Sequence, residues 1–433
     1  MLVWLIHLAE MLVTDPAERA WRYGMLSEAI AARGHRVVQW APTFAHYTRQ
    51  YRAPADAVLS PRPGYELQLV HAGGYDNNVS LRRILFQVRM ARRFSQIAQR
   101  RERPDVIVVA VPTPTMCSAA LKFGRQHGIP VLIDVRDLWP DAIYDLFPKK
   151  IRFLGKALLL PMRLRNRRIF REATGATAIS GAYLQWALDY AGRAQRWSDG
   201  VFPMGYKPPE IQESIREAAR ASWRRRGVTG EGFTCCFFGT MGRQYWLEDV
   251  IEAARRLPEV RFVLCGDGDN RGKYVEQARE LSNVMFPGWV SAEEVDSLIH
   301  LSDVGLAPYR GGAQMSLPNK PFEYMAGGLP VVSSLQGELQ ELLEKHRCGL
   351  TYRAGDVASL QHSLERLRNE ADLRESMSRN GRDLYERSFR SDRVYGAMTT
   401  HLETVVERHL EAASSGKLPS RARREAEGGL TPP

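Results

Sequence analysis

The run Val106–Val111 constrains the fold more than any other stretch of this chain, because all of its residues are apolar. A strand without polar residues must be covered on both faces, and such strands are typical of parallel sheets with helices on either side. Four more strands are predicted in the first half, at Leu2–His7, Arg36–Trp40, Val131–Val135 and Thr174–Ser180. Residues Ala20–Arg33 have the apolar spacing of a helix. The first half therefore predicts an α/β domain with a parallel sheet.

The second half of the chain restarts this pattern. Apolar strands are predicted at Phe233–Phe238 and Val260–Cys265, each followed by a glycine-containing turn. A chain of 433 residues is long enough for two domains with separate cores. We place the N-terminal domain at 1–204 and the C-terminal domain at 205–388, followed by a final helix at about 389–411. The polar residues 412–433 predict a disordered tail.

Composition and charge narrow the range of partners. Hydrophobic residues make up 44% of the chain and charged residues 25%, as in globular proteins. The sequence contains no apolar run of about eighteen residues, the length expected of a membrane-spanning helix. The net charge of +11 and the pI near 9.5 predict an anionic partner. Nucleic acid, anionic lipid and a phosphorylated substrate all fit this description.

Two basic segments carry much of the positive charge. The first, Arg82–Arg103, predicts a helix with a solvated basic side over a packed apolar stripe. That stripe consists of Leu81, Ile84, Leu85, Val88 and Phe94. The second segment, residues 149–171, holds nine basic residues and no acidic ones, with leucines between them. It suits either an anionic membrane surface or the outer side of a core-facing helix.

Nucleic-acid binding is not expected of this chain. The sequence shows no helix-turn-helix spacing, no RNP-like aromatic pair and no zinc finger. The positive charge is therefore better matched by a lipid or a phosphorylated small molecule than by DNA or RNA.

Polar residues gather at the predicted strand ends of the first half, where open α/β sheets bind their ligands. The stretch Asp134–Asp141 crowds acids, an arginine and a tryptophan together, as in a structural salt-bridge knot or the edge of an active site. Within it, Asp137 is our candidate for a carboxylate at the site. His7 ends the first strand, where a lone histidine is more often structural than catalytic. Arg22 either meets an anion at this edge or is a solvated helix residue.

Glycine turns follow the second-half strands. Gly239 and Gly242 lie in one turn, which ends in the cation Arg243, and Gly266 and Gly268 lie in the next. Glycines let backbone N–H groups approach a diphosphate, and a helix N-terminus adds a favourable potential.

The stretch 316–332 predicts a short helix that begins near Asn319 and ends at Gly327. Lys320 and Glu323 are three residues apart and share one face of this helix. A cation and a carboxylate at a helix start can hold a phosphate and a sugar hydroxyl side by side. An isolated pair with this spacing is usually a weak surface ion pair, so the surrounding sequence has to decide.

That surrounding sequence resembles a known family. The segments SDVGLAPY at 302–309, SLPNKPFEYMAGGLPVV at 316–332 and Gly337–Glu338 resemble the nucleotide-sugar-binding region of retaining glycosyltransferases of family 4. The resemblance is closest to the subgroup that builds bacterial surface polysaccharides, which also shows the D-x-R-D-L-W-P pattern found at 134–140. It implies the GT-B fold: two Rossmann-like parallel-sheet domains facing across a cleft, with the final helix returning to the first domain.

The chain departs from the larger family at two places. Met315 stands where the first of two glutamates, eight positions apart, is found, and Glu323 matches the second. Thr240 and Tyr245 stand where an arginine and a lysine are found. These departures affect the side chains that would contact the transferred sugar and the diphosphate.

The resemblance implies metal-independent transfer of a hexose, with retention, from a nucleotide-diphospho-sugar to an acceptor hydroxyl. No further cofactor is implied. Lys320 and Arg243 are expected at the leaving diphosphate, and Glu323 at the ribose. The remaining implied donor-binding residues are Gly239, Gly242, Gly266, Gly268, Gly337 and Ser316. Asp137, together with His7, is implied on the acceptor side, where it orients the hydroxyl or takes its proton.

Together with segment 149–171, the resemblance implies a lipid-linked saccharide acceptor in cell-surface polysaccharide assembly. The implied location is cytoplasmic and peripheral, on the inner face of a bacterial plasma membrane. Two other classes stay open on the sequence: a non-catalytic, nucleotide-sugar-binding membrane adaptor, and a nucleotide-sugar epimerase on the same fold.

Overall fold

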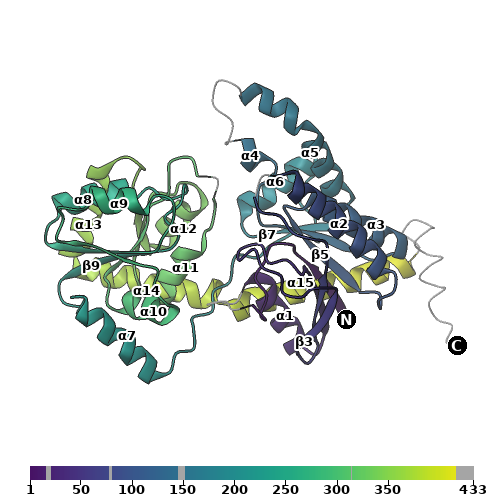
Figure 1. Cartoon of the computed structure of the whole chain (residues 1–433), viewed down its shortest axis with the longest axis horizontal. Coiled ribbons are helices and arrows are strands. Elements are labelled where there is room, and N and C mark those ends of the chain that lie inside the picture. The colour runs from purple at the N-terminus through teal and green to yellow at the C-terminus, as the bar shows by residue number, and fades with distance from the viewer. Residues whose placement is uncertain (16–20, 78–79, 145–151, 314, 416–433) are drawn as a thin grey trace. The chain divides into compact units, whose positions relative to one another are not determined.

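The computed structural model describes the chain except for residues 16–20, 78–79, 145–151, 314 and 416–433 (Figure 1). The chain divides into two compact units: Met1–Gly205 with Val394–Pro433, and Tyr206–Arg393. The predicted tail at 412–433 lies outside the described residues, apart from its first few, which complete helix α15 (Ser391–Ser414).

The first unit contains an eight-stranded sheet with the order β3-β4-β2-β1-β5-β6-β7-β8. Its strands are β1 (Leu2–Ile6), β2 (Arg36–Pro42), β3 (Ala57–Arg62), β4 (Tyr65–Val70), β5 (Val106–Val111), β6 (Val131–Val135), β7 (Gly175–Ala178) and β8 (Gly200–Val201). Neighbouring strands are parallel except in the β3–β4 hairpin. The apolar strands β1 and β5 lie in the middle, where both faces are covered.

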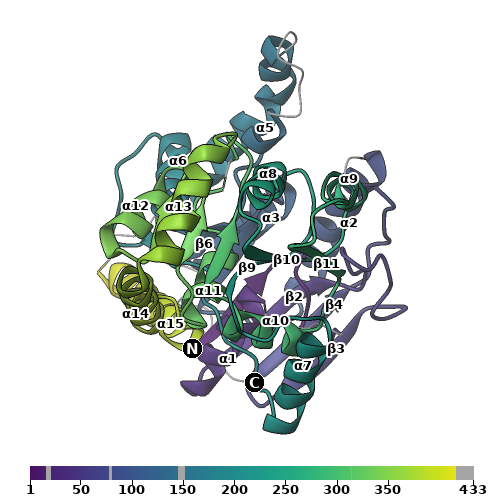
Figure 2. The same ribbon diagram turned by 90° about the vertical axis from the view of Figure 1, so that its left-hand side faces the viewer.

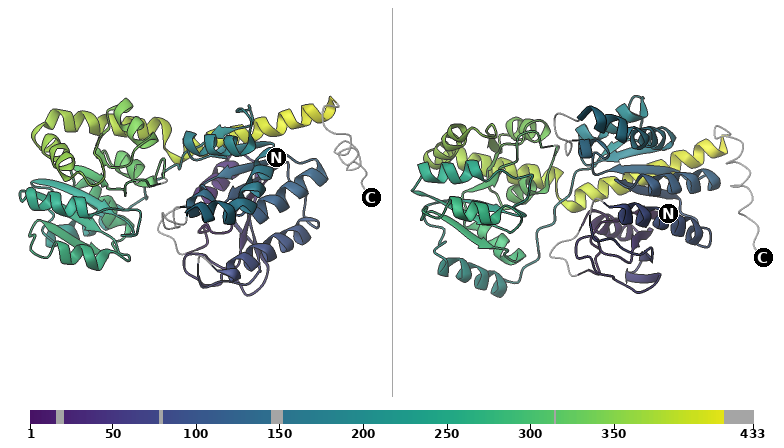
Figure 3. Two further views of the ribbon diagram at one scale, coloured as in Figure 1. Left: turned by 90° about the horizontal axis from the view of Figure 1, so that it is seen from above. Right: turned by 45° about the horizontal axis from the view of Figure 1, so that its top comes forward.

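Helices pack on both faces of this sheet (Figures 1 and 3). Besides α15 they are α1 (Arg22–Ala32), α2 (Leu81–Ala98), α3 (Pro114–His127), α4 (Asp141–Tyr144), α5 (Arg152–Glu172) and α6 (Gly181–Ala191). On one face, α1 and α15 share a core that includes Tyr23 and Tyr395. On the other face, α2, α3, α5 and α6 pack around a second core that includes Trp4 and Trp40.

Helix α2 does not pack as the sequence predicted. Of the predicted stripe only Phe94 is buried, where its ring contacts Trp4 and Trp40. The side that packs on the sheet consists of Phe86, Met90, Phe94 and Ala98, one residue in every four. At about 100° per residue, the other four predicted residues lie on nearly the opposite side of the helix. That side is exposed, and its members are Leu81 at 79%, Ile84 at 57%, Leu85 at 52% and Val88 at 38%.

The second unit contains a six-stranded parallel sheet with the order β11-β10-β9-β12-β13-β14 (Figure 2). Its strands are β9 (Phe233–Phe238), β10 (Val260–Cys265), β11 (Val284–Gly288), β12 (Val304–Ala307), β13 (Val331–Ser333) and β14 (Gly349–Thr351). Its helices are α7 (Glu213–Arg225), α8 (Glu248–Arg256), α9 (Arg271–Gln277), α10 (Ala292–His300), α11 (Asn319–Ala326), α12 (Glu338–His346), α13 (Val357–Asn369) and α14 (Ala371–Ser388).

Helix α11 is the short helix that the sequence predicted. It follows Pro318 and is capped by Gly327. It lies close against β12, because a side-chain carbon at Gly305 would lie only 2.3 Å from the ring of Tyr324. The Tyr324 hydroxyl donates a 3.0 Å hydrogen bond to the carbonyl oxygen of Leu306. Helix α11 is thereby fixed relative to the sheet through its second turn.

Candidate functional site

The predicted site residues in each unit follow the carboxyl ends of parallel strands. In the first unit, His7 comes directly after β1 and Asp137 follows β6. In the second unit, Gly239 follows β9 and Gly266 follows β10. The carboxyl ends of parallel strands meet at one edge of a sheet, which is where open α/β folds bind ligands.

Lys320 sits at the second position of α11 and points back to the end of β9. Its Nζ donates a hydrogen bond of 2.7 Å to the hydroxyl of Tyr245 and lies 4.5 Å from the centre of that ring. A side-chain carbon built on Gly239 would lie 2.4 Å from the same Nζ. The ammonium group is therefore held at the glycine turn, where a side chain at position 239 would displace it.

The glycines of the β9 and β10 turns allow these turns to pack closely. The N–H of Gly239 donates to the carbonyl of Cys265 at 3.1 Å. A side-chain carbon on Gly266 would lie 1.9 Å from the carbonyl oxygen of Gly239, and one on Gly268 would lie 3.0 Å from the backbone of Met241. All three glycines have positive φ, between 130° and 146°. Their conformation and their surroundings both require glycine.

We expect Gly266→Ala to destabilise the second unit by roughly 1–3 kcal/mol, since the new methyl group meets the Gly239 carbonyl and φ is unfavourable. Gly242→Ala is the matched control, because its nearest heavy atom lies at 3.8 Å. Urea unfolding followed by fluorescence measures both midpoints. Equal midpoints for the two variants would contradict the close packing described above.

The other predicted donor-side residues surround this turn in sequence and differ in exposure. Glu323, one turn after Lys320, is 9% exposed. The Ser316 hydroxyl donates to the carboxylate of Glu338, the first residue of α12, which follows Gly337. Arg243 is an exposed side chain in the turn after β9. The structure thus joins Lys320 to the glycine turns and ties Ser316 to the start of α12, while Arg243 projects into solvent.

Arg22 is neither solvated nor open to an incoming anion, in contrast to the prediction. It is fully buried at the start of α1 and forms a bidentate pair with Asp134, with both N–O distances at 3.0 Å. Its Nη1 also donates to the carbonyls of Phe202 and Pro203, at 2.8 and 3.0 Å. Burial would raise the pKa of Asp134, but Arg22 and a hydrogen bond from Thr177 hold it below its usual value. Asp134 is therefore part of a buried, structural salt-bridge network, the structural salt-bridge knot of the prediction.

His7 is a neutral imidazole at neutral pH. Burial, followed by the charges of Arg136 and His46, holds its pKa well below the usual value. Its Nδ1 accepts a hydrogen bond from the N–H of Ala9 at 3.2 Å, which leaves the proton on Nε2. Arg136 beside it is paired with Glu10. His7 is therefore suited to donate a hydrogen bond from Nε2 rather than to carry a positive charge.

Asp137 lies outside the knot, although it is only three residues from Asp134. Burial raises its pKa, while a hydrogen bond from the backbone of Leu138 and the charge of Arg83 act in the opposite direction. A carboxylate with a raised pKa holds a proton more readily than an exposed one. The 134–141 stretch thus combines a paired structural acid with a second acid whose pKa is shifted the other way.

Sequence reasoning missed several residues at these edges. Tyr245 was noted only as a departure from a family pattern, yet its hydroxyl holds Lys320. Glu10 was not singled out because it lies beyond the first strand. His46 and Tyr75 follow β2 and β4, and Tyr75 was missed because β4 was not predicted. A hydrogen bond of 2.7 Å joins His46 Nδ1 to the Tyr75 hydroxyl.

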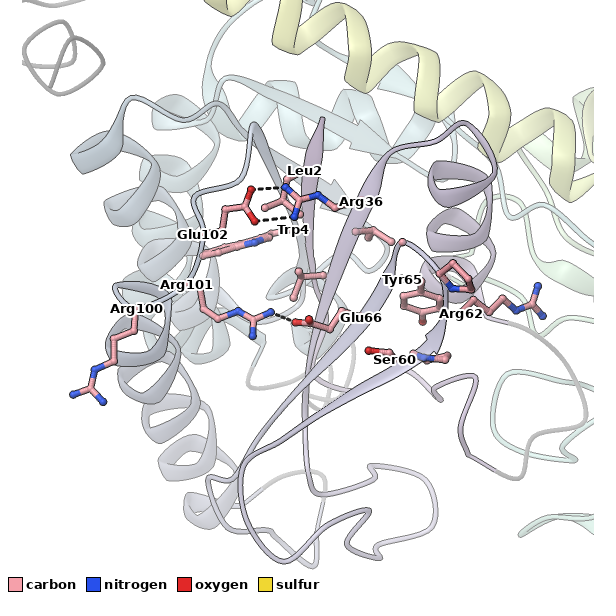
Figure 4. A pocket seen from close by; sticks show the side chains of 15 residues that line it. Leu2, Trp4, Arg36, Ser60, Arg62, Tyr65, Glu66, Arg100, Arg101 and Glu102 are labelled. Carbon is pink, nitrogen blue, oxygen red and sulfur yellow. Dashed lines mark hydrogen bonds and ion pairs between the residues drawn. The ribbon is translucent and has the colours of Figure 1, made fainter. Parts of the chain in front are cut away.

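A hollow of about 800 Å³ lies at the amino ends of β1 and β2, beside the β3–β4 hairpin (Figure 4). The described residues that line it include none of the predicted site residues. Two of its arginines pair with its two acids: Arg36 pairs with Glu102, and Arg101 pairs with Glu66 (Figure 4). This hollow is at the opposite end of the strands from His7 and Asp137, and both of its acids are already paired with arginines.

The predicted membrane-facing segment corresponds to helix α5, although Lys149 and Lys150 lie outside the described residues. Asn166, Ile169 and Phe170 are buried on its inner side. Its exposed side carries Leu158 and Leu164, at 68% and 56%, and the arginines Arg163, Arg165, Arg167 and Arg168. Among the described helices, none has the length and apolar character needed to cross a bilayer.

Comparison with known families gives matches over both units. The profile described as "Glycosyl transferase 4-like domain" matches residues 20–198, and the one described as "Glycosyl transferases group 1" matches residues 232–370. The first match lies in the first unit and the second match in the second unit.

Among curated proteins, the chain is similar to the putative colanic acid biosynthesis glycosyl transferase WcaI of Escherichia coli (strain K12). The two are 23% identical over 346 residues, which cover 74% of this chain and 81% of WcaI. It is also 23% identical over 300 residues to the sulfoquinovosyl transferase SQD2 of Arabidopsis thaliana. That match covers 68% of this chain but only 55% of the plant protein.

Solved structures agree with the fold described above. Sucrose-phosphate synthase from Thermosynechococcus elongatus superposes with a TM-score of 0.68 at 17% identity, covering 95% of this chain and 99% of that one. HepE from Anabaena, solved in complex with UDP, gives a TM-score of 0.64 at 16% identity, covering 93% and 99%. At such low identity these likenesses bear on the fold alone.

Proposed function

Because this chain belongs to the GT-B glycosyltransferases of family 4, we propose that it is a retaining, metal-independent hexosyltransferase. It moves a sugar from a nucleotide-diphospho-sugar to the hydroxyl of a lipid-linked saccharide, in the assembly of a bacterial cell-surface polysaccharide. The similarity to WcaI, whose name places it in colanic acid biosynthesis, supports this class of product. The UDP bound to HepE supports a nucleotide-sugar donor.

The position of Lys320 is the observation that carries the proposal. Its ammonium group lies at a glycine-lined strand end, where backbone N–H groups can approach a diphosphate. When the bond between the sugar and the diphosphate breaks, its electron pair goes to a diphosphate oxygen. Lys320 and the exposed Arg243 offset this growing negative charge, and these two cations replace a metal ion in that role.

Tyr245 replaces the second cation of the larger family with a hydrogen-bonding hydroxyl. This hydroxyl accepts from Lys320 at 2.7 Å and holds the ammonium group at the glycine turn. Glu323 binds the ribose hydroxyls from the same helix, and the turns at Gly242, Gly268 and Gly337 complete the donor site. Ser316 acts through Glu338, with which it is hydrogen bonded at the start of α12.

Asp137 and His7 act on the acceptor. Asp137 orients the acceptor hydroxyl or takes its proton, since burial raises the pKa of this carboxyl. His7 is neutral and donates from Nε2 to an acceptor oxygen. The oxygen of the hydroxyl forms the new bond to the sugar as the old bond to the diphosphate breaks. The hydroxyl proton passes to Asp137 or, if Asp137 only orients the hydroxyl, to the leaving diphosphate.

The direct test is binding of nucleotide-sugars, followed by the effect of Glu323→Ala. A panel of nucleotide-diphospho-sugars screened by thermal shift should contain a ligand that stabilises the chain. Glu323→Ala should lower the affinity for that ligand by about tenfold or more, because a hydrogen bond to a charged group contributes roughly 1.5–3 kcal/mol. Calorimetry measures the loss, and Glu341→Ala, an exposed glutamate on α12, is the control.

Unchanged affinity in Glu323→Ala would remove this residue from the donor site. Binding without transfer to any lipid extract would favour the adaptor instead of the enzyme. Steady consumption of donor without an acceptor would favour the epimerase.

We further propose that the protein is cytoplasmic and binds the inner face of the plasma membrane through α5. Its exposed arginines meet anionic headgroups, and Leu158 and Leu164 enter the interface. Neutralising Arg163, Arg165, Arg167 and Arg168 together to glutamine should release the protein from phosphatidylglycerol vesicles in a flotation assay. Each basic residue near such a surface contributes about 1 kcal/mol.

A second quadruple variant controls for the loss of net charge. It replaces Arg224, Arg225, Arg255 and Arg256, which are exposed on α7 and α8 of the second unit. This control should still float with the vesicles. Equal flotation of both variants and the wild type would make α5 a purely structural helix.

A further inference from the structure

Two arginines from different elements converge on one buried tyrosine at the carboxyl edge of the first sheet. Tyr75 follows β4 and is 5% exposed. The guanidinium carbon of Arg49, from the loop after β2, lies 5.0 Å from the centre of the Tyr75 ring. That of Arg83, from the first turn of α2, lies 5.7 Å from the same centre and 5.9 Å from the ring of Trp139.

The loop that carries Arg49 has a defined shape. A bridge between Phe44 and Tyr51 closes it, and the N–H of Arg49 donates to the carbonyl of Ala45 at 3.0 Å. Arg49 itself has a φ of 58°, which is uncommon for a residue with a side chain. The Tyr75 ring that its guanidinium contacts also packs on Phe86 of α2, with the ring centroids 5.1 Å apart.

The positive charges of the two arginines shift the pKa values of neighbouring groups. Burial, followed by Arg83 and Arg49, lowers the pKa of His46 to about 4. Arg83 also acts on Asp137, whose pKa it lowers against the effect of burial. Two positive charges at one ring make the potential at this edge of the sheet positive, which favours the approach of an anion. The cluster is also next to Asp137, the acid assigned to the acceptor.

We propose that Arg49 and Arg83 bind the phosphate or diphosphate group by which a lipid carries the acceptor saccharide. This inference rests on the proposed function, since it names the ligand group beside Asp137. Guanidinium groups match phosphate oxygens in geometry as well as charge. The Tyr75 ring contacts both arginines, and its hydroxyl is hydrogen bonded to His46.

The outer side of α2 identifies the lipid as the source of this phosphate. Leu81, Ile84, Leu85 and Val88 are exposed there, on the helix whose first turn carries Arg83. A helix with its side chains is about 10 Å across, so this apolar side lies about one helix diameter from the arginines. A diphosphate at Arg83 would therefore have its hydrocarbon chain pass around the N-terminal end of α2 to the apolar side.

The test uses the full chain with Lys320→Ala, so that the donor-side diphosphate site does not contribute. Farnesyl diphosphate, inorganic pyrophosphate and farnesol are titrated by calorimetry. Arg83→Gln and Arg49→Gln should each lower the affinity for both diphosphates by about tenfold or more. Arg82→Gln is the matched control, because Arg82 is adjacent, exposed and paired with the exposed Asp76. It should leave both affinities unchanged.

A further pair of variants separates the lipid from the free phosphate. Ile84→Ser combined with Leu85→Ser should lower the affinity for farnesyl diphosphate and leave the affinity for pyrophosphate unchanged. If this double serine variant changes vesicle flotation but not the affinity for farnesyl diphosphate, the apolar side of α2 contacts the bilayer. The proposal that this side binds the hydrocarbon chain of the acceptor lipid is then wrong. Melting temperatures equal to the wild type exclude unfolding, and Arg83→Lys should restore part of the affinity.

Equal losses of diphosphate affinity in Arg83→Gln and Arg82→Gln would overturn the proposal. They would indicate that the diphosphates respond to net charge and not to a site at Arg83. No loss in either Arg49→Gln or Arg83→Gln would overturn it as well. Nucleotide-sugar binding to the chain with Lys320 intact distinguishes failure of this inference from failure of the proposed function. If a nucleotide-sugar binds and farnesyl diphosphate does not, this inference fails and the proposed function stands; if no nucleotide-sugar binds, the proposed function fails.

Discussion

Replacing Lys320 by alanine is expected to lower kcat by about 10²–10³-fold, the loss typical for one preorganised group that stabilises developing charge. The ammonium group lies at the β9 glycine turn, held by the Tyr245 hydroxyl at 2.7 Å. In the proposed reaction the diphosphate gains negative charge as it leaves, so the loss should fall mainly on kcat rather than on KM. Initial rates with a radiolabelled nucleotide-sugar and a lipid acceptor measure it.

Two variants make this result specific. Lys345→Ala removes an exposed lysine from α12 and should leave the rate near that of the wild type. Tyr245→Phe keeps the ring but removes the hydroxyl that accepts from Lys320, so it should produce a smaller loss than Lys320→Ala. Wild-type rates in Lys320→Ala would place the lysine outside the site.

Replacing Arg22 by alanine should destabilise the first unit by about 3–5 kcal/mol, because it leaves the buried carboxylate of Asp134 without its charge partner. Both side chains are fully buried, so water does not compensate for the loss. The midpoint of urea unfolding of the first unit measures the effect. Arg36→Ala is the control: its pair with Glu102 is exposed at 60% on both sides, so the expected change is about 0–1 kcal/mol.

The same pair makes the stability of the first unit depend on pH. The pKa of Asp134 is lower in the folded chain than in an unfolded one, because Arg22 and Thr177 outweigh burial. Its contribution is therefore fully present above the unfolded value of about 3.9 and is lost as the pH falls through the folded value. In Arg22→Ala this acid dependence should weaken or reverse. Equal midpoints for Arg22→Ala and Arg36→Ala would show that the buried pair is not a major source of stability.

Local patterns were sufficient to predict helix α11. Pro318 before it, Gly327 after it and the apolar strand that follows set the bounds of α11 within a residue. The apolar strands β1, β5, β9 and β10 were predictable for a similar reason, since a run of apolar residues can be buried only in a covered sheet.

Features that depend on tertiary contacts were not predictable. Arg22 reads as a solvated helix residue until the fold places Asp134 beside it, more than a hundred positions away in the chain. The apolar residues of α2 form two sets, and only packing on Trp4 and Trp40 decides which set is buried. The edge strand β3 is mostly exposed and contains Pro61, so it lacks the alternation that marks a strand.

The proposed donor site rests on a family resemblance more than on a physical pattern. A lysine and a glutamate three apart have little weight alone. The role of Tyr245 was missed because a tyrosine at a position that usually holds a cation gives no signal by itself. Its hydrogen bond to Lys320 becomes visible only when β9 and α11 are placed together.

The first unit is discontinuous in sequence, since it combines residues 1–205 with a segment that begins at Val394. During synthesis on the ribosome, the core face that receives Tyr395, Met398 and Leu402 stays uncovered until the whole second unit has been made. The second unit, 206–393, is continuous and can close its own core first. A nascent chain that stops before α15 therefore presents a bare apolar face to chaperones, which makes the last helix the step that commits the first unit to its native state.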